Sequence, residues 1–177
     1  INIMAYDMHG AWENVTNHQS ALYGAAGDQL TDQAAVHNYI AAGAPAKKLV
    51  LGVPFYGRSW KNAGSGNGGL NQPASGAPMG SYDDTGMFDY KDIQSRLASQ
   101  PSVYIRHWDD SAKVPWVYDA RDNNGTFITY DDVSSIHEKT AFVRSSALGG
   151  VMFWELSGDS RTPADSLLYT IHDDMTK

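Results

Sequence analysis

The chain has 177 residues, of which 42% are hydrophobic and 11% aromatic, and its formal net charge at pH 7 is -7. These values are typical of a globular domain with a packed core and exclude a chain that is mainly disordered. The acidic balance, with no basic run longer than Lys47-Lys48, argues against nucleic acid or an anionic membrane as a partner. No apolar run is long enough to span a bilayer, and the absence of cysteine excludes disulfides.

The first third of the chain predicts a strand, a helix and a second strand. Residues 2–6 are a compact apolar run that suits a short buried strand. Thr31 can cap a helix that Gly43 and Pro45 end. The apolar run 49–55 reads as a strand buried on both faces. A strand, helix and strand in this order form the crossover unit of an α/β fold.

The middle of the chain predicts a small antiparallel α+β insertion. Residues 60–80 shift to Gly, Ser, Asn and Pro, which interrupts the α/β pattern. A helix is expected at 89–98, followed by three short β-branched and aromatic runs, "SVYIRHW", "KVPWVYD" and "GTFITY".

The α/β pattern then resumes. Residues from Asp131 have apolar positions at helical spacing up to a stop at Gly149. An apolar strand at 150–155 and a last helix at 163–171 complete the chain. We therefore expect three parallel strands with helices between them.

Each expected parallel strand is followed by polar or aromatic side chains. In parallel α/β proteins, sites are built at the carboxyl ends of the strands, so these residues are candidates for chemistry. The alternative is that the aromatics are core and the charges begin solvated loops. The groups are Tyr6 and Asp7, Tyr56 and Arg58, and Trp154 and Glu155.

Several familiar motifs lack the context that they need, so we predict no cofactor and no metal. The run Gly64–Gly69 matches G-x-G-x-x-G but does not open a helix. The six histidines show no metal-binding spacing, and Ser157 lacks the G-x-S-x-G turn of a serine hydrolase.

The sequence is also rich in aromatic side chains near neutral polar groups, which suits the binding of sugar rings. Each tryptophan taken alone is more often core. The aromatics considered are Trp12, Tyr56, Trp60, Trp108 and Trp154.

Four separated motifs give the chain a specific resemblance. "MAYDMHGAW", "KLVLGVPFYGRSW" and "GGVMFWELSGD" resemble the last three barrel strands of family 18 glycoside hydrolases, the chitinases. "WDDSAKVPWVYD" followed by "ITYDD" is similar to the insertion domain that many of these enzymes carry, and "FWELSGD" is closer to the bacterial branch. The resemblance implies part of a TIM (β/α)8 barrel, strands six to eight, with an α+β insertion. It divides the chain into residues 1–58, 59–130 and 131–177.

The family hydrolyses β-1,4-linked N-acetylglucosamine polymers with retention, using the substrate's own N-acetyl oxygen as nucleophile. By resemblance, Tyr6 and Asp7 support catalysis, the first at the N-acetyl group and the second at the distorted sugar. The remaining matched residues are expected to bind substrate; they are Met4, Trp12, Tyr56, Arg58 and Trp154.

The family's acid glutamate lies in D-x-x-D-x-D-x-E, and that spacing does not occur in this sequence. Because the chain begins at Ile1 rather than Met, we expect it to be processed, cleaved or truncated upstream. We therefore expect a chitinase fragment that is inactive alone, whose partners are chitin or chito-oligosaccharides and the missing N-terminal half of the barrel. A secreted location follows from the resemblance. The alternatives are a non-catalytic chitin-binding lectin-like protein and an endo-N-acetylglucosaminidase.

Overall fold

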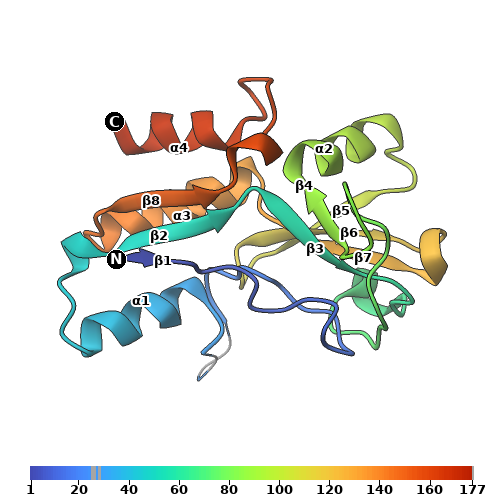
Figure 1. The fold of residues 1–177 in the computed structure, drawn as a ribbon, viewed down its shortest axis with the longest axis horizontal. Coiled ribbons are helices and arrows are strands. Elements are labelled where there is room, and N and C mark those ends of the chain that lie inside the picture. The colour runs from blue at the N-terminus through green and yellow to red at the C-terminus, as the bar shows by residue number, and fades with distance from the viewer. Residues whose placement is uncertain (25–26, 28, 177) are drawn as a thin grey trace.

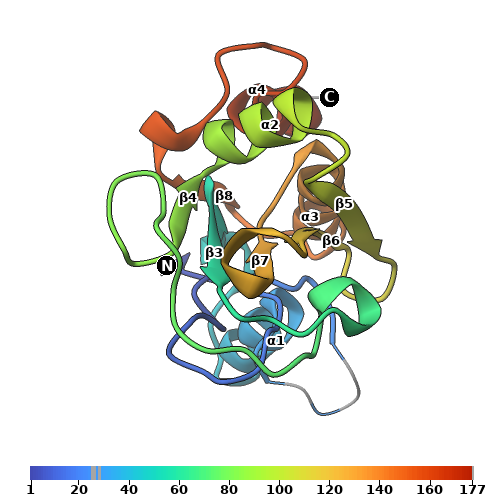
Figure 2. The same cartoon turned by 90° about the vertical axis from the view of Figure 1, so that its right-hand side faces the viewer.

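A computed structural model describes residues 1–24, 27 and 29–176, which form two β-sheets with four α-helices packed around them (Figure 1). A three-stranded sheet with helices α1, α3 and α4 around it occupies one side of the view. A five-stranded sheet with helix α2 occupies the other. Turned by 90°, the molecule presents the five-stranded sheet to the viewer (Figure 2).

The smaller sheet is parallel, in the order β1-β2-β8. Strand β2 (Val50–Pro54) lies at its centre, between β1 (Asn2–Ile3) and β8 (Gly150–Trp154). Leu51 of β2 is aligned with Ile3 on one side and with Val151 on the other. The three predicted parallel strands are therefore confirmed.

Strand β1 is shorter than the predicted range 2–6. The Ala5 amide donates a hydrogen bond back to the Ile3 carbonyl at 2.9 Å, which turns the chain out of the sheet after two paired residues. Ala5 itself is still buried. The apolar run of residues 2–6 thus reflects burial, but only Asn2 and Ile3 pair with the neighbouring strand.

Two of the helices begin at side-chain caps that the sequence contains. Helix α1 (Asp32–Ala41) starts after Thr31, whose hydroxyl accepts the Ala34 amide at 3.1 Å, as predicted. Helix α3 (Val133–Ser145) starts with a capping box, in which Asp132 and Ser135 each accept the other's backbone amide. Such caps supply partners for amides that the first turn of a helix leaves unpaired.

The last helix, α4 (Leu167–Thr176), begins four residues later than the predicted start at 163. The cause is a distant cap. The carboxylate of Asp159 accepts the backbone amides of Leu167 at 2.9 Å and Leu168 at 3.1 Å, and also the Ser166 hydroxyl at 2.7 Å. The helix therefore begins where Asp159 can reach its open amides.

The chain passes from one sheet to the other at Phe55. Strand β2 ends at Pro54, and strand β3 (Tyr56–Trp60) begins one residue later in the five-stranded antiparallel sheet, ordered β4-β3-β7-β6-β5. The predicted helix of the insertion is α2 (Tyr90–Ser99). The remaining strands are β4 (Met87–Asp89), β5 (Ile105–Asp109), β6 (Val114–Asp119) and β7 (Thr126–Thr129), and the 3₁₀ turns are Ala46–Lys48, Gly66–Gly69, Asp122–Asn124 and Leu156–Gly158.

Shared apolar packing joins the two sheets. Phe55 is fully buried and its ring stacks on that of Phe153 at 4.6 Å between centroids. The same cluster includes Ile93 of α2, Ile128 of β7 and Ile136 of α3, so it spans both sheets. Within the described residues, no helix is both long and apolar enough to cross a membrane.

A buried ion cluster lies where α1, α3 and the end of β7 meet. The Lys139 ammonium lies 2.9 Å from Asp131 and 3.1 Å from Asp32, and it donates to the Ser20 carbonyl at 2.7 Å. Burial opposes the charge on Lys139, but the two carboxylates outweigh it and raise its pKa. Burial also raises the pKa of Asp32, to about 8.

Replacing Lys139 by methionine is expected to destabilise the fold by about 3–5 kcal/mol, because the buried Asp131 carboxylate loses its counter-charge and Asp32 loses its ammonium partner. Chemical denaturation of the variant at pH 7 measures the loss. Lys47→Met is the matched control, since Lys47 is exposed and forms no ion pair within the described residues. Equal stability of the two variants would contradict a stabilising role for the cluster.

Candidate functional site

Asp7 lies at the centre of a cluster of predicted site residues that come from both sheets. Its carboxylate accepts the Tyr56 hydroxyl at 2.8 Å. The Arg58 guanidinium donates to both of its oxygens, from Nε at 2.7 Å and from Nη2 at 2.9 Å. Asp7 follows β1, whereas Tyr56 and Arg58 belong to β3, so the ion pair crosses from the parallel sheet to the antiparallel one.

The Arg58 guanidinium also contacts two aromatic rings. Its Cζ atom lies 5.6 Å from the ring centroid of Trp12 and 5.3 Å from that of Tyr56. Hydrogen bonding to Asp7 is the main cause of a raised Arg58 pKa. A bidentate partner and aromatic faces together restrict a guanidinium more than either would alone, so Arg58 is a rigid part of this cluster.

Tyr6 lies over the centre of the parallel sheet. A Cβ atom built on Gly52 of β2 would lie 2.5 Å from the Ile3 carbonyl oxygen and 3.0 Å from the Tyr6 ring, so the backbone of β1 and the ring both approach this glycine closely. The ring meets Tyr56 edge to face at 6.1 Å. Burial, and then the charge of Asp7, raises the pKa of Tyr6. Its hydroxyl is therefore protonated at neutral pH and available as a donor.

Burial, and then the charge of Asp7, also raises the pKa of Tyr56, whose hydroxyl donates to Asp7. Asp7 itself has a φ of 59°, in the left-handed region that aspartate enters more readily than most residues. The backbone at Asp7 thus turns sharply while its carboxylate is held by donors from β3.

Trp12 lies beside Arg58 and depends on a neighbouring glycine. Its ring would lie 2.2 Å from a Cβ atom built on Gly10, so the indole folds back over the glycine backbone. The indole is nevertheless 60% exposed, so one face is open to a ligand. The loop that carries it is braced by a 2.8 Å contact between His9 and Glu13 and by the Trp60 indole, which donates to the Glu13 carbonyl at 3.1 Å.

Met4 and Trp154 are not part of the hydrogen-bonded cluster around Asp7. Both are exposed, Met4 at 70% and Trp154 at 57%, which is unusual for large apolar side chains. Trp154 is the last residue of β8, where its carbonyl accepts the Phe55 amide at 2.7 Å. The two side chains therefore leave apolar surface near the ends of β1 and β8.

Two of the aromatics considered for sugar binding lie elsewhere. Trp60 is fully buried against Phe127, so of the two roles considered for it, a core position is confirmed and an open ring face for a sugar is not. Trp108 lies on β5, where the Arg106 guanidinium covers its ring at 5.3 Å. An aromatic at a strand position suits core and surface alike, and residue type alone does not separate these roles.

Gln19 is a buried residue that the sequence did not single out. Its side-chain amide donates to the Tyr56 carbonyl at 2.7 Å, directly behind the cluster. The only signal in the sequence is a polar run, "TNHQS", inside a segment that reads as loop. Such a run is indistinguishable from an exposed one until the partner strands are known.

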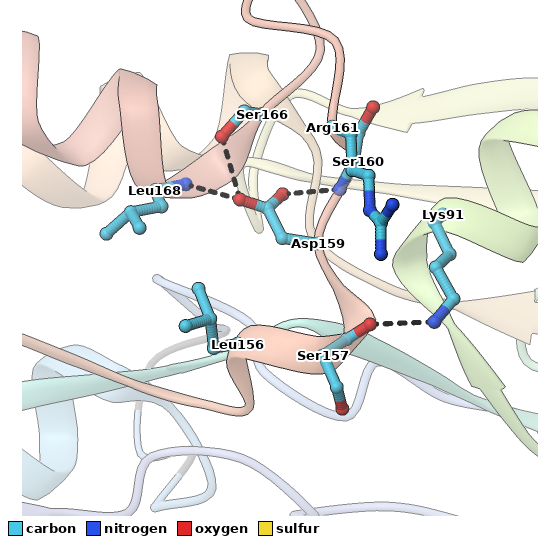
Figure 3. Close-up of a pocket in the computed structure, with 8 residues that line it drawn as sticks. All are labelled: Lys91, Leu156, Ser157, Asp159, Ser160, Arg161, Ser166 and Leu168. Atoms are coloured by element: carbon cyan, nitrogen blue, oxygen red, sulfur yellow. Dashed lines mark hydrogen bonds between the residues drawn. The ribbon is translucent and has the colours of Figure 1, made fainter.

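A separate pocket of about 700 Å³ lies beyond the end of β8, between α2 and the start of α4 (Figure 3). None of the predicted site residues lines it. Its Lys91 donates to the Ser157 carbonyl at 2.7 Å, and its Asp159 caps α4. These polar groups are already used within the protein, and we assign no function to this pocket.

Among residues 1–24, 27 and 29–176, no group of three or more His, Cys, Asp or Glu side chains is arranged to hold a metal ion. The cluster around Asp7 instead combines one carboxylate, fixed donors and exposed aromatic surface. Such a set can hold a neutral polar ligand by hydrogen bonds and ring stacking.

Comparison with known proteins identifies the family. The family described as Glycosyl hydrolases family 18 matches residues 1–159, which include every residue of the cluster. The chain belongs to family 18 of the glycosyl hydrolases. This confirms the family that the four sequence motifs indicated.

Relatives within family 18 include Chitinase A1 of Niallia circulans, which is 43% identical over 90% of this chain and 24% of its own length. The solved structure of Chitinase ChiA74 from Bacillus thuringiensis superposes with a TM-score of 0.86 and 42% identity, covering 99% of this chain and 31% of that one. The solved structure of the Group IV chitinase of Ostrinia furnacalis in complex with allosamidin superposes with a TM-score of 0.88 and 30% identity. This match covers 99% of this chain and 50% of that one.

The chain therefore spans half or less of each of these proteins. Two of the three are bacterial, which fits the bacterial-type "FWELSGD" motif. The superpositions cover both sheets, so the mixed α/β fold of this chain is a fold that family 18 enzymes contain.

Gly10→Ala is expected to displace the Trp12 indole, because the new methyl group occupies the space that the ring now fills. Acrylamide quenching of tryptophan fluorescence measures the change as a rise in the accessibility of the indole. The rise should disappear when Gly10→Ala is combined with Trp12→Phe. Gly64→Ala is the control, because the nearest atoms to its Cβ, 3.3 Å away, belong to the flexible Gln72 side chain. Unchanged quenching in Gly10→Ala would show that the indole position does not depend on Gly10.

Proposed function

We propose that the protein carrying this chain is a chitinase, which hydrolyses β-1,4 linkages between N-acetylglucosamine residues. The observation that carries this proposal is the Asp7 cluster, in which a carboxylate held by Tyr56 and Arg58 lies close to a protonated Tyr6 and to the open Trp12 ring. Chitin offers the matching chemistry, since its sugar rings stack on indoles and its amide and hydroxyl groups need hydrogen-bond partners.

We further propose that β1, β2 and β8 are strands six to eight of a (β/α)8 barrel and that the antiparallel sheet, which begins at Tyr56 rather than at the expected residue 59, forms the insertion domain up to residue 130. The free edges of the parallel sheet support this assignment. Strands β1 and β8 each pair on one side only, and the residues of β8 are incompletely buried. Unpaired edges of this kind are normally covered, so the remaining strands of the barrel are the expected neighbours of β1 and β8.

In the proposed reaction, the N-acetyl oxygen of the substrate attacks the anomeric carbon as the bond to the leaving oxygen breaks. The leaving oxygen takes a proton from an acid, and water then opens the oxazolinium ion with retention. Tyr6 suits a donor role toward the N-acetyl group, because its raised pKa keeps the hydroxyl protonated. Asp7, charged and fixed by Arg58, suits the stabilisation of positive charge that develops on the oxazolinium ring.

The other site residues are proposed to bind the sugar chain. Trp154 would form the floor beneath the sugar that reacts, and Met4 would shape the pocket under the acetyl methyl group. Trp12 would stack on a sugar on the leaving-group side. Their exposure supports these roles, because each leaves apolar surface uncovered by the described protein.

The acid is proposed to come from residues outside these 177, since D-x-x-D-x-D-x-E is absent from the sequence. Glu155 and Glu13 do not replace it. The Glu155 carboxylate accepts the Ser157 hydroxyl at 2.5 Å, and Glu13 pairs with His9. The chain alone would then bind without cleaving, and an extracellular site of action is proposed because chitin is an extracellular polymer.

The full-length protein is expected to release the fluorophore from a fluorogenic chitobioside, while purified residues 1–177 release none. A lectin-like protein would bind chito-oligosaccharide, seen as tryptophan quenching, without any release. An endo-N-acetylglucosaminidase would instead cleave the chitobiose core of an N-glycan. Turnover by residues 1–177 alone would refute the assignment of the acid to another part of the protein.

Tyr6→Phe in the full-length protein is expected to lower kcat about 10²-fold, because one donor to the developing charge is lost. KM should change little, since the ring that packs on Gly52 is kept. Tyr39→Phe is the control, as that tyrosine is exposed on α1. A kcat within twofold of wild type would remove Tyr6 from the mechanism.

A further inference from the structure

Residues 18–22 form a strap that follows the first loop and is attached to both halves of the molecule. The Leu22 amide donates to the Ala112 carbonyl at 2.9 Å, and the Ser20 hydroxyl donates to Asp131 at 2.6 Å. His18 lies 3.2 Å from Asp109. Gln19, in the middle of this strap, is fully buried.

Gln19 makes the contacts that reach the Asp7 cluster. Its backbone carbonyl accepts the Met8 amide at 3.0 Å, one residue after Asp7. Its side-chain amide donates to the Tyr56 carbonyl at 2.7 Å and approaches the Thr129 carbonyl at 3.4 Å. Its backbone amide donates to the Thr129 hydroxyl at 3.2 Å.

These contacts lie where the ladder between β3 and β7 stops. Arg58 is aligned with Thr129, the last residue of β7, so Tyr56 has no partner on that strand. The Gln19 amide takes the place of the missing pair, since it donates to the carbonyl that β7 leaves free. One residue thus links the two parts of the cluster, since its backbone carbonyl holds the peptide after Asp7 and its side-chain amide holds the backbone of Tyr56.

We propose that Gln19 is a positioning residue for the Asp7 cluster, holding the Asp7 carboxylate and the Tyr56 hydroxyl at the separation that their hydrogen bond requires. The inference rests on the proposed function, because the cluster matters for hydrolysis only if the protein is a chitinase. Gln19 itself lies behind the cluster and acts through Met8 and Tyr56.

The unpaired side-chain oxygen of Gln19 argues against a role in stability alone. Its Oε1 atom is buried and accepts no hydrogen bond from the described residues. A buried acceptor without a donor costs about 1–3 kcal/mol, which offsets much of what the amide donors contribute. A methionine of similar length removes the unpaired acceptor but leaves the Tyr56 carbonyl without its donor, so the two effects on stability largely offset each other while the effect on position remains.

The test is Gln19→Met in the full-length protein, assayed on the fluorogenic chitobioside. We expect kcat to fall about 10-fold or more, because small displacements of reacting groups are costly, while KM stays within about twofold. The thermal midpoint should remain close to that of wild type. A crystal structure of the variant should show the Tyr56 hydroxyl moved away from Asp7.

Gln72→Met is the matched control, because within the described residues the Gln72 side-chain amide donates to the nearby carbonyls of Leu70 and Asn71 alone. Gln19→Asn is a second variant, which keeps a buried amide but is too short to reach Tyr56. An unchanged kcat in both Gln19 variants, or an equal loss in Gln72→Met, would overturn the proposal. A wild-type protein that releases no fluorophore would instead overturn the proposed function. The crystal structure of Gln19→Met would still show whether Gln19 fixes the distance between Tyr56 and Asp7.

Discussion

The ion pair between Arg58 and Asp7 is the constraint on which the rest of the site depends. It joins a residue after the first parallel strand to a residue of the antiparallel sheet, so the two sheets meet at a defined separation. Its bidentate geometry fixes the orientation of the carboxylate as well as its place. The rings of Trp12 and Tyr56 then pack around the guanidinium, and each gains a position that its own backbone does not specify.

The backbone supports this ion pair in two ways. The direct passage from β2 to β3 through buried Phe55 leaves little freedom between the sheets. The strap around Gln19 closes the opposite side, where β7 has ended. These contacts fix the backbone from which Tyr56 and Arg58 extend, so a partly exposed carboxylate keeps a fixed set of side-chain donors.

Much of the fold followed from local signals in the sequence. The Thr31 cap, the buried run of β2 and the three aromatic runs of the insertion each depend on residues close together in the chain. Two of the features that differ from the prediction, or that it left open, involve partners outside the local segment. Helix α4 starts where Asp159 reaches it, and Trp60 is enclosed by a strand nearly seventy residues further along. The third is local, since β1 ends where Ala5 turns back to Ile3.

The sequence by itself determined the family and the succession of the three parallel strands, and it supplied the candidate site residues, because these depend on motifs and on periodic burial. Only the tertiary structure decided which of those residues meet. The crossing from one sheet to the other brings Asp7, Tyr56 and Arg58 together. Met4 and Trp154 are exposed and take no part in the hydrogen bonds around Asp7. The role of Gln19 also belongs to the tertiary structure, because hydrogen bonds between residues far apart in the chain leave no periodic trace in the sequence.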